Sequence, residues 1–243
     1  MNNRQAEIEK HFLNIKFSNE TIDVYVPRIS ILQAVKENLQ IFKGVMLDVG
    51  CGQMPYRELI FDNNNKVKKY LGLDLASSTV HNTSIADLHW DAKIIPLENE
   101  TIDSAMATEV LEHSFYPNET LSEIYRVLKP GGSFFCTVPF LWPLHEVPYD
   151  AFRYTPFSLK MLLENAGFQN IEIKSLGGWN ASLAQMIGLW VSENKYVGFR
   201  KKVAMKIGKR LMRFLLKTDV KDNNFTQHCM ITGLCATAIK SNN

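Results

Sequence analysis

Two apolar runs that each end in an acid constrain the fold of this chain more than any other feature. The first is VMLDVGCG, which ends at Gly52, and the second is LGLD, which ends at Asp74. The first run begins without alternating polar positions, as is typical of a strand that is covered on both faces of a parallel sheet. Gly50 and Gly52 permit a sharp turn and a close approach to the backbone, and a helix beginning near Pro55 would present unpaired amide groups. The pattern predicts an α/β sheet with a ligand at the end of this strand.

Two acids, Asp74 and Asp48, indicate which kind of ligand this site binds. Asp74 stands about 20 residues after the glycine turn, where an acid accepts hydrogen bonds from ribose hydroxyls in nucleotide-binding folds. NAD would favour a third glycine, but residues 53–56 are Gln, Met, Pro and Tyr. Asp48 would repel a pyrophosphate and suits a ligand that carries an amine and a sulfonium. These residues favour S-adenosylmethionine over NAD.

Five segments in this order resemble the class I S-adenosylmethionine-dependent methyltransferases, and among them the group called type 11. They are LDVGCG at 47–52, LGLD at 71–74, WDAKIIPLENETID at 90–103, EVLEH at 109–113 and RVLKPGG at 126–132. The likeness extends from about Leu47 to Phe168.

The resemblance implies roles for seven residues as cofactor contacts. By it, Asp48, Gly50 and Gly52 border the methionine part, Asp74 takes the ribose, Asp91 with Ala92 reads the adenine edge, and Glu109 lies along the cofactor. The chain departs from the common pattern by lacking the third glycine. It also offers Asp87 as a second candidate for the acid at the adenine.

Alternating strand and helix patterns predict one α/β domain over residues 1–243. Strands are expected at 69–74, 83–87, 102–108, 132–138, 169–175 and 230–240 besides the first run, and helices at 27–42, 55–61, 118–128 and 156–166. The resemblance implies a doubly wound, Rossmann-like sheet of seven mostly parallel strands with a final antiparallel strand. Residues 1–43 are expected to form a helical lead-in, and residues 177–227 a helical insertion before the last strand.

Composition fits a cytoplasmic enzyme. The chain has 243 residues, of which 46% are hydrophobic, and a formal net charge of +2, so no global field favours nucleic acid. No signal peptide or membrane-spanning run is found. Four cysteines lack CxxC or zinc-site spacing, so we expect reduced thiols and assign no metal.

A basic amphipathic helix is predicted at 199–217. This stretch holds eight basic residues and no acid, with basic and apolar residues on separate stripes. Such a face is either solvated surface or a contact for anionic lipid headgroups or a phosphate-bearing acceptor. Aromatics are not interleaved with the basic residues as stacking on nucleic acid requires, so we expect no nucleic acid partner.

Residues 139–156, PFLWPLHEVPYDAFRYTP, concentrate titratable groups after the fifth strand, at the edge where ligands bind in open α/β sheets. His145 is the candidate general base for a hydroxyl, with Asp150 or Glu146 orienting it or taking its place. Arg153 could hold an acidic group of the acceptor. The alternatives are a histidine that braces the fold and a simple ion pair between Asp150 and Arg153. We interpret His113 as structural or as bordering the cofactor.

The same loop, followed by Ala166-Gly167-Phe168, resembles methyltransferases of bacterial surface-glycan and secondary-metabolite pathways. The resemblance implies a small-molecule or glycan-type acceptor, most simply a sugar hydroxyl that receives an O-methyl group. Two alternatives stay open, C- or N-methylation as in quinone or amino-sugar pathways, and a binding module that holds S-adenosylmethionine without turnover. Nothing in 47–113 is visibly disabled, which disfavours the binding module.

Overall fold

The computed structural model describes residues 3–76 and 85–242. The chain divides into two compact units, which we describe separately. The first unit comprises Met1–Ala34 and Ser175–Gly233, and the second comprises Val35–Lys174 and Leu234–Asn243.

The second unit is built on a seven-stranded sheet in the order β3-β2-β1-β4-β5-β7-β6. The strands are β1 (Gly44–Val49), β2 (Val67–Leu75), β3 (Leu88–Trp90), β4 (Ile102–Thr108), β5 (Leu128–Pro139), β6 (Phe168–Ser175) and β7 (Gly233–Lys240). Pairing is parallel from β3 through β5, and one strand of the sheet is antiparallel. The predicted Rossmann-like α/β fold is confirmed. Strand order reverses between β1 and β4, the kind of position where open α/β sheets bind ligands at their carboxyl edge.

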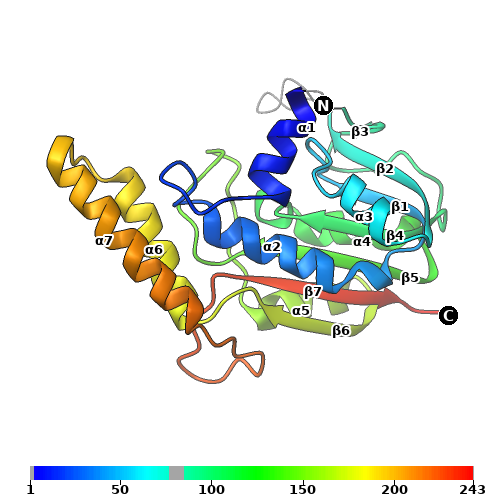
Figure 1. Ribbon diagram of the computed structural model, residues 1–243. Coiled ribbons are helices and arrows are strands. Elements are labelled where there is room, and N and C mark those ends of the chain that lie inside the picture. Colours follow the sequence, from blue (N-terminus) through cyan, green and yellow to red (C-terminus); the bar gives the residue numbers. More distant parts are fainter. Residues whose placement is uncertain (1–2, 77–84, 243) are drawn as a thin grey trace. The chain divides into compact units, whose positions relative to one another are not determined.

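Helices lie on both faces of this sheet (Figure 1). They are α3 (Arg57–Asn63), α4 (Pro117–Val127) and α5 (Pro156–Asn165), with a short 3-10 turn, η3 (Leu111–His113), after β4; a second 3-10 turn, η2 (Leu39–Ile41), precedes β1. α4 buries Leu121, Ile124 and Val127 at helical spacing, so one stripe of the helix packs on the sheet. α5 begins with Pro at its first position and a capping box in which the side chains of Thr155 and Ser158 exchange hydrogen bonds with the backbone.

The first unit is helical. It contains α1 (Asn3–Ile8), a π-helical turn η1 (Glu9–Leu13), the start of α2 (Tyr25–Glu37), α6 (Trp179–Glu193) and α7 (Gly198–Lys217). The predicted insertion, residues 177–227, supplies α6 and α7. The buried core of the first unit includes Ile22, Val26, Val191 and Met212. A Cβ at Gly208 would lie 2.8 Å from Cγ2 of Val191, so glycine lets α7 pack closely on α6.

Two predicted strand boundaries are wrong. The strand expected at 83–87 falls partly on 77–84, outside the described residues, and among those described the strand occupies Leu88–Trp90. Asp87 instead turns its carboxylate to accept the backbone N–H of Gly72 at 2.8 Å. The strand expected from 132 begins at Leu128, with a register irregularity against β4 around Pro130, which has no N–H to donate, and with Gly131 at φ +70°.

Among the described helices, none combines the length and the apolar character needed to cross a membrane.

Candidate active site

The glycine turn follows β1 and is fastened to β2. The backbone N–H groups of Gly50 and Cys51 both donate to the carbonyl of Leu73, at 2.8 and 3.1 Å. Gly50 has φ +66°, and a Cβ there would lie 2.5 Å from Cγ2 of Val110. Gly52 has φ +49°, and no atom of the described residues lies within 4 Å of a Cβ position there. The first glycine therefore allows close packing on Val110, and the second faces open space that a ligand can approach.

Asp48 and Asp74 end the neighbouring parallel strands β1 and β2, and both are buried. Tyr70 donates its hydroxyl to Oδ2 of Asp48 at 2.6 Å. Burial raises the pKa of Asp48 to about 7; the hydrogen bond from Tyr70 opposes this and the charge of Asp74 adds to it. Oδ1 of Asp74 accepts the N–H of Leu75 at 2.8 Å. Two neighbouring carboxyl groups that are both buried from solvent favour a ligand that carries positive charge.

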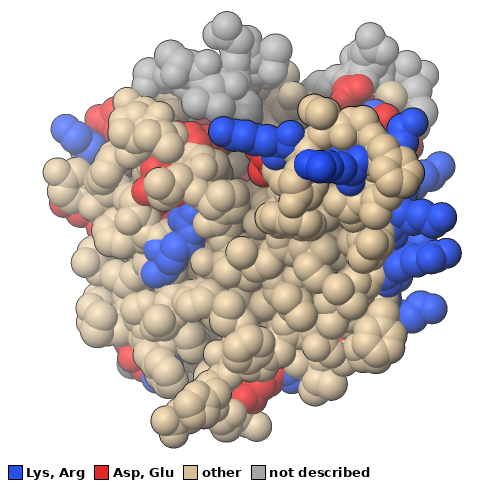
Figure 2. Space-filling model, turned by 90° about the vertical axis from the view of Figure 1, so that its left-hand side faces the viewer, with Lys and Arg blue, Asp and Glu red and all other residues tan. Residues whose placement is uncertain are grey.

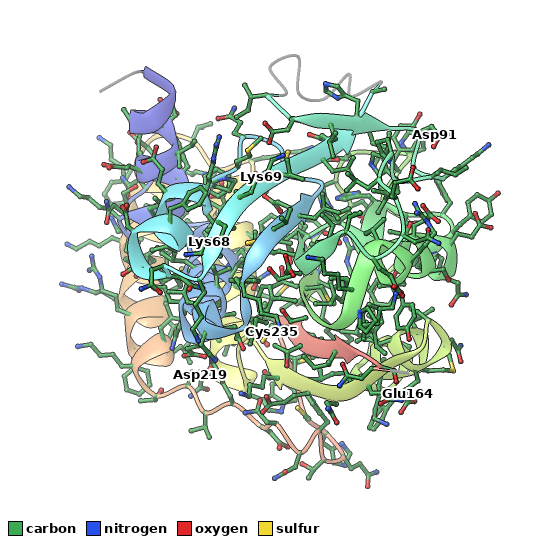
Figure 3. The ribbon with its side chains drawn as sticks, turned by 90° about the vertical axis from the view of Figure 1, so that its right-hand side faces the viewer. Lys68, Lys69, Asp91, Glu164, Asp219 and Cys235 are labelled. Atoms are coloured by element: carbon green, nitrogen blue, oxygen red, sulfur yellow. The ribbon has the colours of Figure 1, made fainter. Side chains whose placement is uncertain are left out.

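The two candidates for the adenine acid lie on either side of β3. Asp91 is exposed, in the segment after β3 (Figure 3), and its Oδ1 accepts the backbone N–H groups of Lys93 and Ile94 at 2.9 and 3.2 Å. These hydrogen bonds lower the pKa of Asp91. Ala92 has φ +63°. Asp87 is held through its bond to Gly72. Which acid reads the adenine stays a prediction.

Glu109 sits between the ends of β4 and β5. Its N–H donates to the carbonyl of Thr137 at 3.0 Å, and its Oε1 accepts the Thr137 hydroxyl at 2.9 Å. The residue has φ +55°, an uncommon conformation for a residue with a side chain, and such strain clusters at functional sites. Glu109 is followed directly by Val110, which packs on the glycine turn.

The proline-rich loop after β5 is attached to η3. The N–H groups of Ala151 and Phe152 both donate to the carbonyl of Glu112, at 2.8 and 3.1 Å. The buried hydroxyl of Tyr154 donates to the carbonyl of Leu111 at 2.8 Å. Because β4 and β5 are adjacent and parallel, these bonds hold the loop at the carboxyl edge of the sheet.

Asp150 is clamped by Arg153 within this loop. The guanidinium donates to both carboxylate oxygens, at 2.6 and 2.8 Å, and this bidentate contact is the main cause that lowers the pKa of Asp150 to about 2. The backbone N–H of His145 donates to Oδ2 of Asp150 at 3.1 Å, and Nδ1 of the ring lies 3.2 Å from the same oxygen. So acidic a carboxyl is a poor base, and its geometry suits orienting His145.

Glu112 and His113 join His145 at this edge, and the sequence interpretation gave Glu112 no role. Glu112 is fully buried, and within the described residues neither of its carboxylate oxygens has a hydrogen-bond partner. Burial, with the charge of Glu109 second, raises the pKa of Glu112. The imidazoles of His113 and His145 pack edge to face with centroids 4.8 Å apart. The sequence signal for this cluster is the pair Glu112-His113 shortly after the strand predicted at 102–108, together with His145 after the strand predicted at 132–138.

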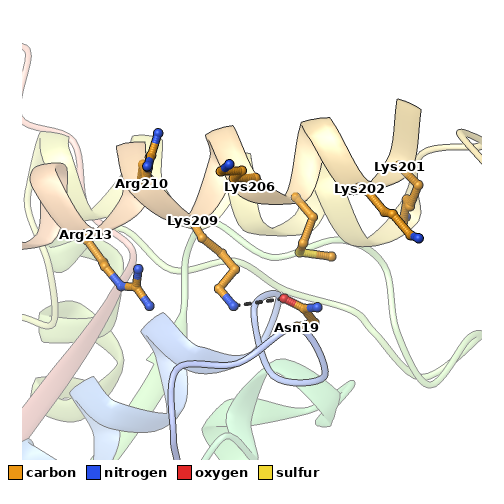
Figure 4. A pocket seen from close by; sticks show the side chains of 8 residues that line it. Asn19, Lys201, Lys202, Lys206, Lys209, Arg210 and Arg213 are labelled. Carbon is orange, nitrogen blue, oxygen red and sulfur yellow. Dashed lines mark hydrogen bonds between the residues drawn. The ribbon is translucent and has the colours of Figure 1, made fainter. Parts of the chain in front are cut away.

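A separate basic hollow lies in the first unit. It has a volume of about 480 Å³ and is lined by cations of α7 (Figure 4): Lys201, Lys202, Lys206, Lys209, Arg210 and Arg213. Asn19 closes one side, with its Oδ1 accepting from Nζ of Lys209 at 2.9 Å. Large apolar side chains of α6 and α7 are exposed as well, namely Trp179, Leu183, Met186, Trp190, Phe199, Ile207 and Phe214. Figure 2 shows Lys and Arg gathered along one edge of a face whose centre is largely uncharged.

Known sequences are similar to this chain over a stretch that includes the first strand and its glycine turn. Residues 47–136 match the family described as a methyltransferase domain. A Mycolicibacterium smegmatis protein named "Probable S-adenosylmethionine-dependent methyltransferase" is 30% identical over an alignment of 135 residues, and the match covers 51% of each chain. The ubiquinone/menaquinone biosynthesis C-methyltransferase UbiE of Bartonella quintana is 28% identical over an alignment of 123 residues, and the match covers 38% of this chain and 47% of its own. The chain spans about half the length of these curated relatives.

Solved structures share the fold over nearly the whole chain. A SAM-dependent methyltransferase from Archaeoglobus fulgidus matches with a TM-score of 0.54 at 17% identity, covering 97% of this chain and 99% of its own. Phosphoethanolamine N-methyltransferase 2 of Haemonchus contortus, solved with phosphomonomethylethanolamine and S-adenosylhomocysteine, matches with a TM-score of 0.52 at 14% identity, covering 98% and 60%.

Proposed function

We propose that residues 47–136, which match a methyltransferase domain, form a class I S-adenosylmethionine-dependent methyltransferase domain, and that the chain methylates a hydroxyl of a sugar, a glycan-related compound or another small molecule. One observation carries the proposal. The glycine turn at Gly50 packs on Val110, and two residues later Glu112 begins a cluster of proton-active groups that includes His113 and the attached His145 loop. The turn that we assign to the cofactor and the cluster that we assign to the acceptor thus share one edge of one sheet.

At the cofactor end, the roles follow from charge and position. Asp48 lies beside Gly50 and Gly52, and the contact described above for its buried carboxylate is the uncharged hydroxyl of Tyr70. A carboxylate in such a place suits the cationic methionine part of S-adenosylmethionine. Asp74 at the end of β2 suits the ribose hydroxyls. We assign Asp91 and Ala92 to the adenine edge, and Glu109 to a position along the cofactor.

At the acceptor end, we assign His145 and Asp150. Methyl transfer is an in-line displacement, so the site must align a nucleophilic oxygen with the sulfonium methyl and exclude water. A hydroxyl must also lose its proton, and an imidazole has an ordinary pKa close to neutral pH. Asp150, fixed by Arg153, orients the ring from the side of Nδ1. The Nε2 side is then the part of the ring that we assign to the acceptor.

Two other activities compete. C-methylation has the support of the UbiE relatives, whose name states a C-methyltransferase, although 28% identity over 38% of this chain carries little about the acceptor. N-methylation is the activity in the name of the Haemonchus contortus structure, whose likeness extends to the fold alone. A binding module without turnover would not require Asp150 to be held by Arg153 and by the backbone N–H of His145 beside the His145 ring.

The basic face of the first unit suits an anionic surface. Exposed Trp179, Trp190 and Phe199 lie on the same pair of helices as the cations that line the hollow. Apolar side chains with cations beside them are the pattern of helices that bind at the lipid interface. We extend the proposal to peripheral contact with anionic lipid, which would bring the enzyme to a lipid-linked acceptor.

The test is transfer of a labelled methyl group from S-adenosylmethionine to a panel of nucleotide sugars, lipid-linked glycans, quinols and amines, read as labelled product and S-adenosylhomocysteine. The proposal expects transfer to a hydroxyl compound and a fall in kcat of about 100-fold or more in His145→Ala. His11→Ala, a histidine of the other unit, serves as the control and should keep full activity. Transfer only to carbon or nitrogen, or unchanged kcat in His145→Ala, would reject the assignment.

A further inference from the structure

One arrangement at the acceptor end has the composition of a metal site. Glu112, His113 and His145 each offer a ligand atom, and these three atoms lie within 4.8 Å of one another. In a tetrahedral zinc site, ligand atoms about 2.1 Å from the ion lie about 3.4 Å apart, so side-chain shifts of roughly 1 Å would bring all three to a common ion.

The carboxylate supplies an independent reason to expect a ligand here. Glu112 is fully buried, and in the described parts of the chain both its oxygens lack a hydrogen-bond partner. Nε2 of His113 is 3.8 Å from Oε1, too long for a hydrogen bond. An unsatisfied carboxyl in the interior is costly, and a cation that binds it removes that cost.

The other ring nitrogen of each histidine lies beside an oxygen, as in metal sites: that of His113 is hydrogen-bonded, and that of His145 is close to a carboxylate without hydrogen-bond geometry. Nδ1 of His113 lies 3.2 Å from the carbonyl oxygen of Tyr149, which can accept a proton from it. Nδ1 of His145 lies 3.2 Å from Oδ2 of Asp150, the carboxylate that Arg153 holds. Histidine ligands commonly give their second N–H to a carbonyl or carboxylate, which fixes the ring with its remaining nitrogen toward the ion.

We propose that Glu112, His113 and His145 bind a divalent transition-metal ion of the Zn²⁺ or Mn²⁺ kind, with the remaining coordination positions open to water or the acceptor. Two imidazoles and a carboxylate suit these ions better than Mg²⁺ or Ca²⁺, which prefer all-oxygen sites. Three protein ligands with an open position characterise catalytic rather than structural zinc.

The use of the ion rests on the proposed function. An acceptor hydroxyl bound to the ion would have its pKa lowered, and its proton would leave to solvent. The resulting oxygen forms a bond to the methyl carbon while the carbon–sulfur bond breaks, giving the methyl ether and S-adenosylhomocysteine. The ion is neither oxidised nor reduced. His145 then acts as a ligand, and the ion takes over its role in removing the proton.

The experiment titrates ZnCl₂ and MnCl₂ into tag-free, chelator-treated full-length protein without cofactor, by calorimetry for zinc and by the electron paramagnetic resonance signal of free Mn²⁺. We expect one equivalent of ion per chain. Glu112→Gln, His113→Ala and His145→Ala should each weaken binding by at least about 100-fold, and Asp150→Asn by about 10- to 100-fold through its loss of ring positioning. His11→Ala should bind as the unchanged protein does.

Circular dichroism and S-adenosylhomocysteine binding are measured on each variant, so that lost metal binding is read only from folded protein; Glu112→Gln keeps the side-chain volume for this purpose. Failure of the unchanged protein to bind either ion below 1 mM would overturn the metal site, as would unaltered binding in the folded ligand variants. Ion binding in a protein that does not bind S-adenosylmethionine would reject the proposed function and leave the metal site standing.

Discussion

Asp48 is a carboxyl group that the fold buries beside Tyr70 and Asp74. Its raised pKa, about 7, means that the folded protein without cofactor binds more protons than the unfolded chain between about pH 4 and pH 7. Stability therefore decreases as pH rises through that window, because burial penalises the charged form. A cationic ligand would reverse the penalty, which links cofactor binding to the release of a proton.

This linkage predicts opposite effects of Asp48→Asn on stability and on binding. At pH 8 without cofactor, the variant should be more stable than the unchanged protein by about 1 to 3 kcal/mol, and the difference should shrink toward pH 5, where the unchanged residue is protonated. Its affinity for S-adenosylmethionine should fall. Urea unfolding at pH 5 and pH 8, with cofactor titrations at both, measures the two effects. A stability advantage of the variant that is larger at pH 5 than at pH 8 contradicts this account.

Residue-level prediction was uneven for a physical reason. Asp48, Gly50, Gly52 and Asp74 stand in short local motifs, and the strands that carry them are adjacent, so the local sequence is enough to predict that these residues lie together. The role of Glu112 was invisible, because its significance comes from complete burial without a partner. No local pattern reports that property.

At the scale of elements, strands with continuous apolar runs were predicted well. The strand expected at 102–108 is β4, Ile102–Thr108, buried along most of its length. Of the strand expected at 83–87, the described residues 85–87 are not strand, and the carboxylate of Asp87 accepts a hydrogen bond from the backbone of Gly72. Short edge strands such as β3 carry too few residues for periodicity to define their ends.

The helices α6 and α7 lead to a prediction about membranes. If the cations of α7 bind anionic lipid, the double variant Lys206→Glu/Arg210→Glu should lose most sedimentation with phosphatidylcholine vesicles that contain phosphatidylglycerol, since each charge near such a surface contributes about 1 kcal/mol. Both residues are exposed and line the basic hollow.

The matched control is Lys68→Glu/Lys69→Glu, which changes the net charge equally at exposed positions of β2 (Figure 3). It should sediment as the unchanged protein does. Equal loss in the two double variants would show a response to net charge, and no sedimentation of the unchanged protein would remove the lipid proposal.

At the scale of the whole molecule, sequence order predicted the sheet because alternating strands and helices follow a limited set of topologies. The division into two compact units was not foreseen, since it depends on contacts among residues 1–34 and 175–233 that are far apart in the chain. The candidate site likewise required β4 and β5 to be neighbours, which brings His145 to Glu112 and His113.

The most direct test of the central claim is calorimetric titration of the full chain with S-adenosylmethionine and, separately, with NAD. We predict saturable binding of one S-adenosylmethionine per chain, weakened by about 1 to 3 kcal/mol in Asp74→Ala, because the variant loses the buried acid that we assign to the ribose hydroxyls. NAD should give no saturable heat. Tight binding of NAD with no response to S-adenosylmethionine would contradict the account.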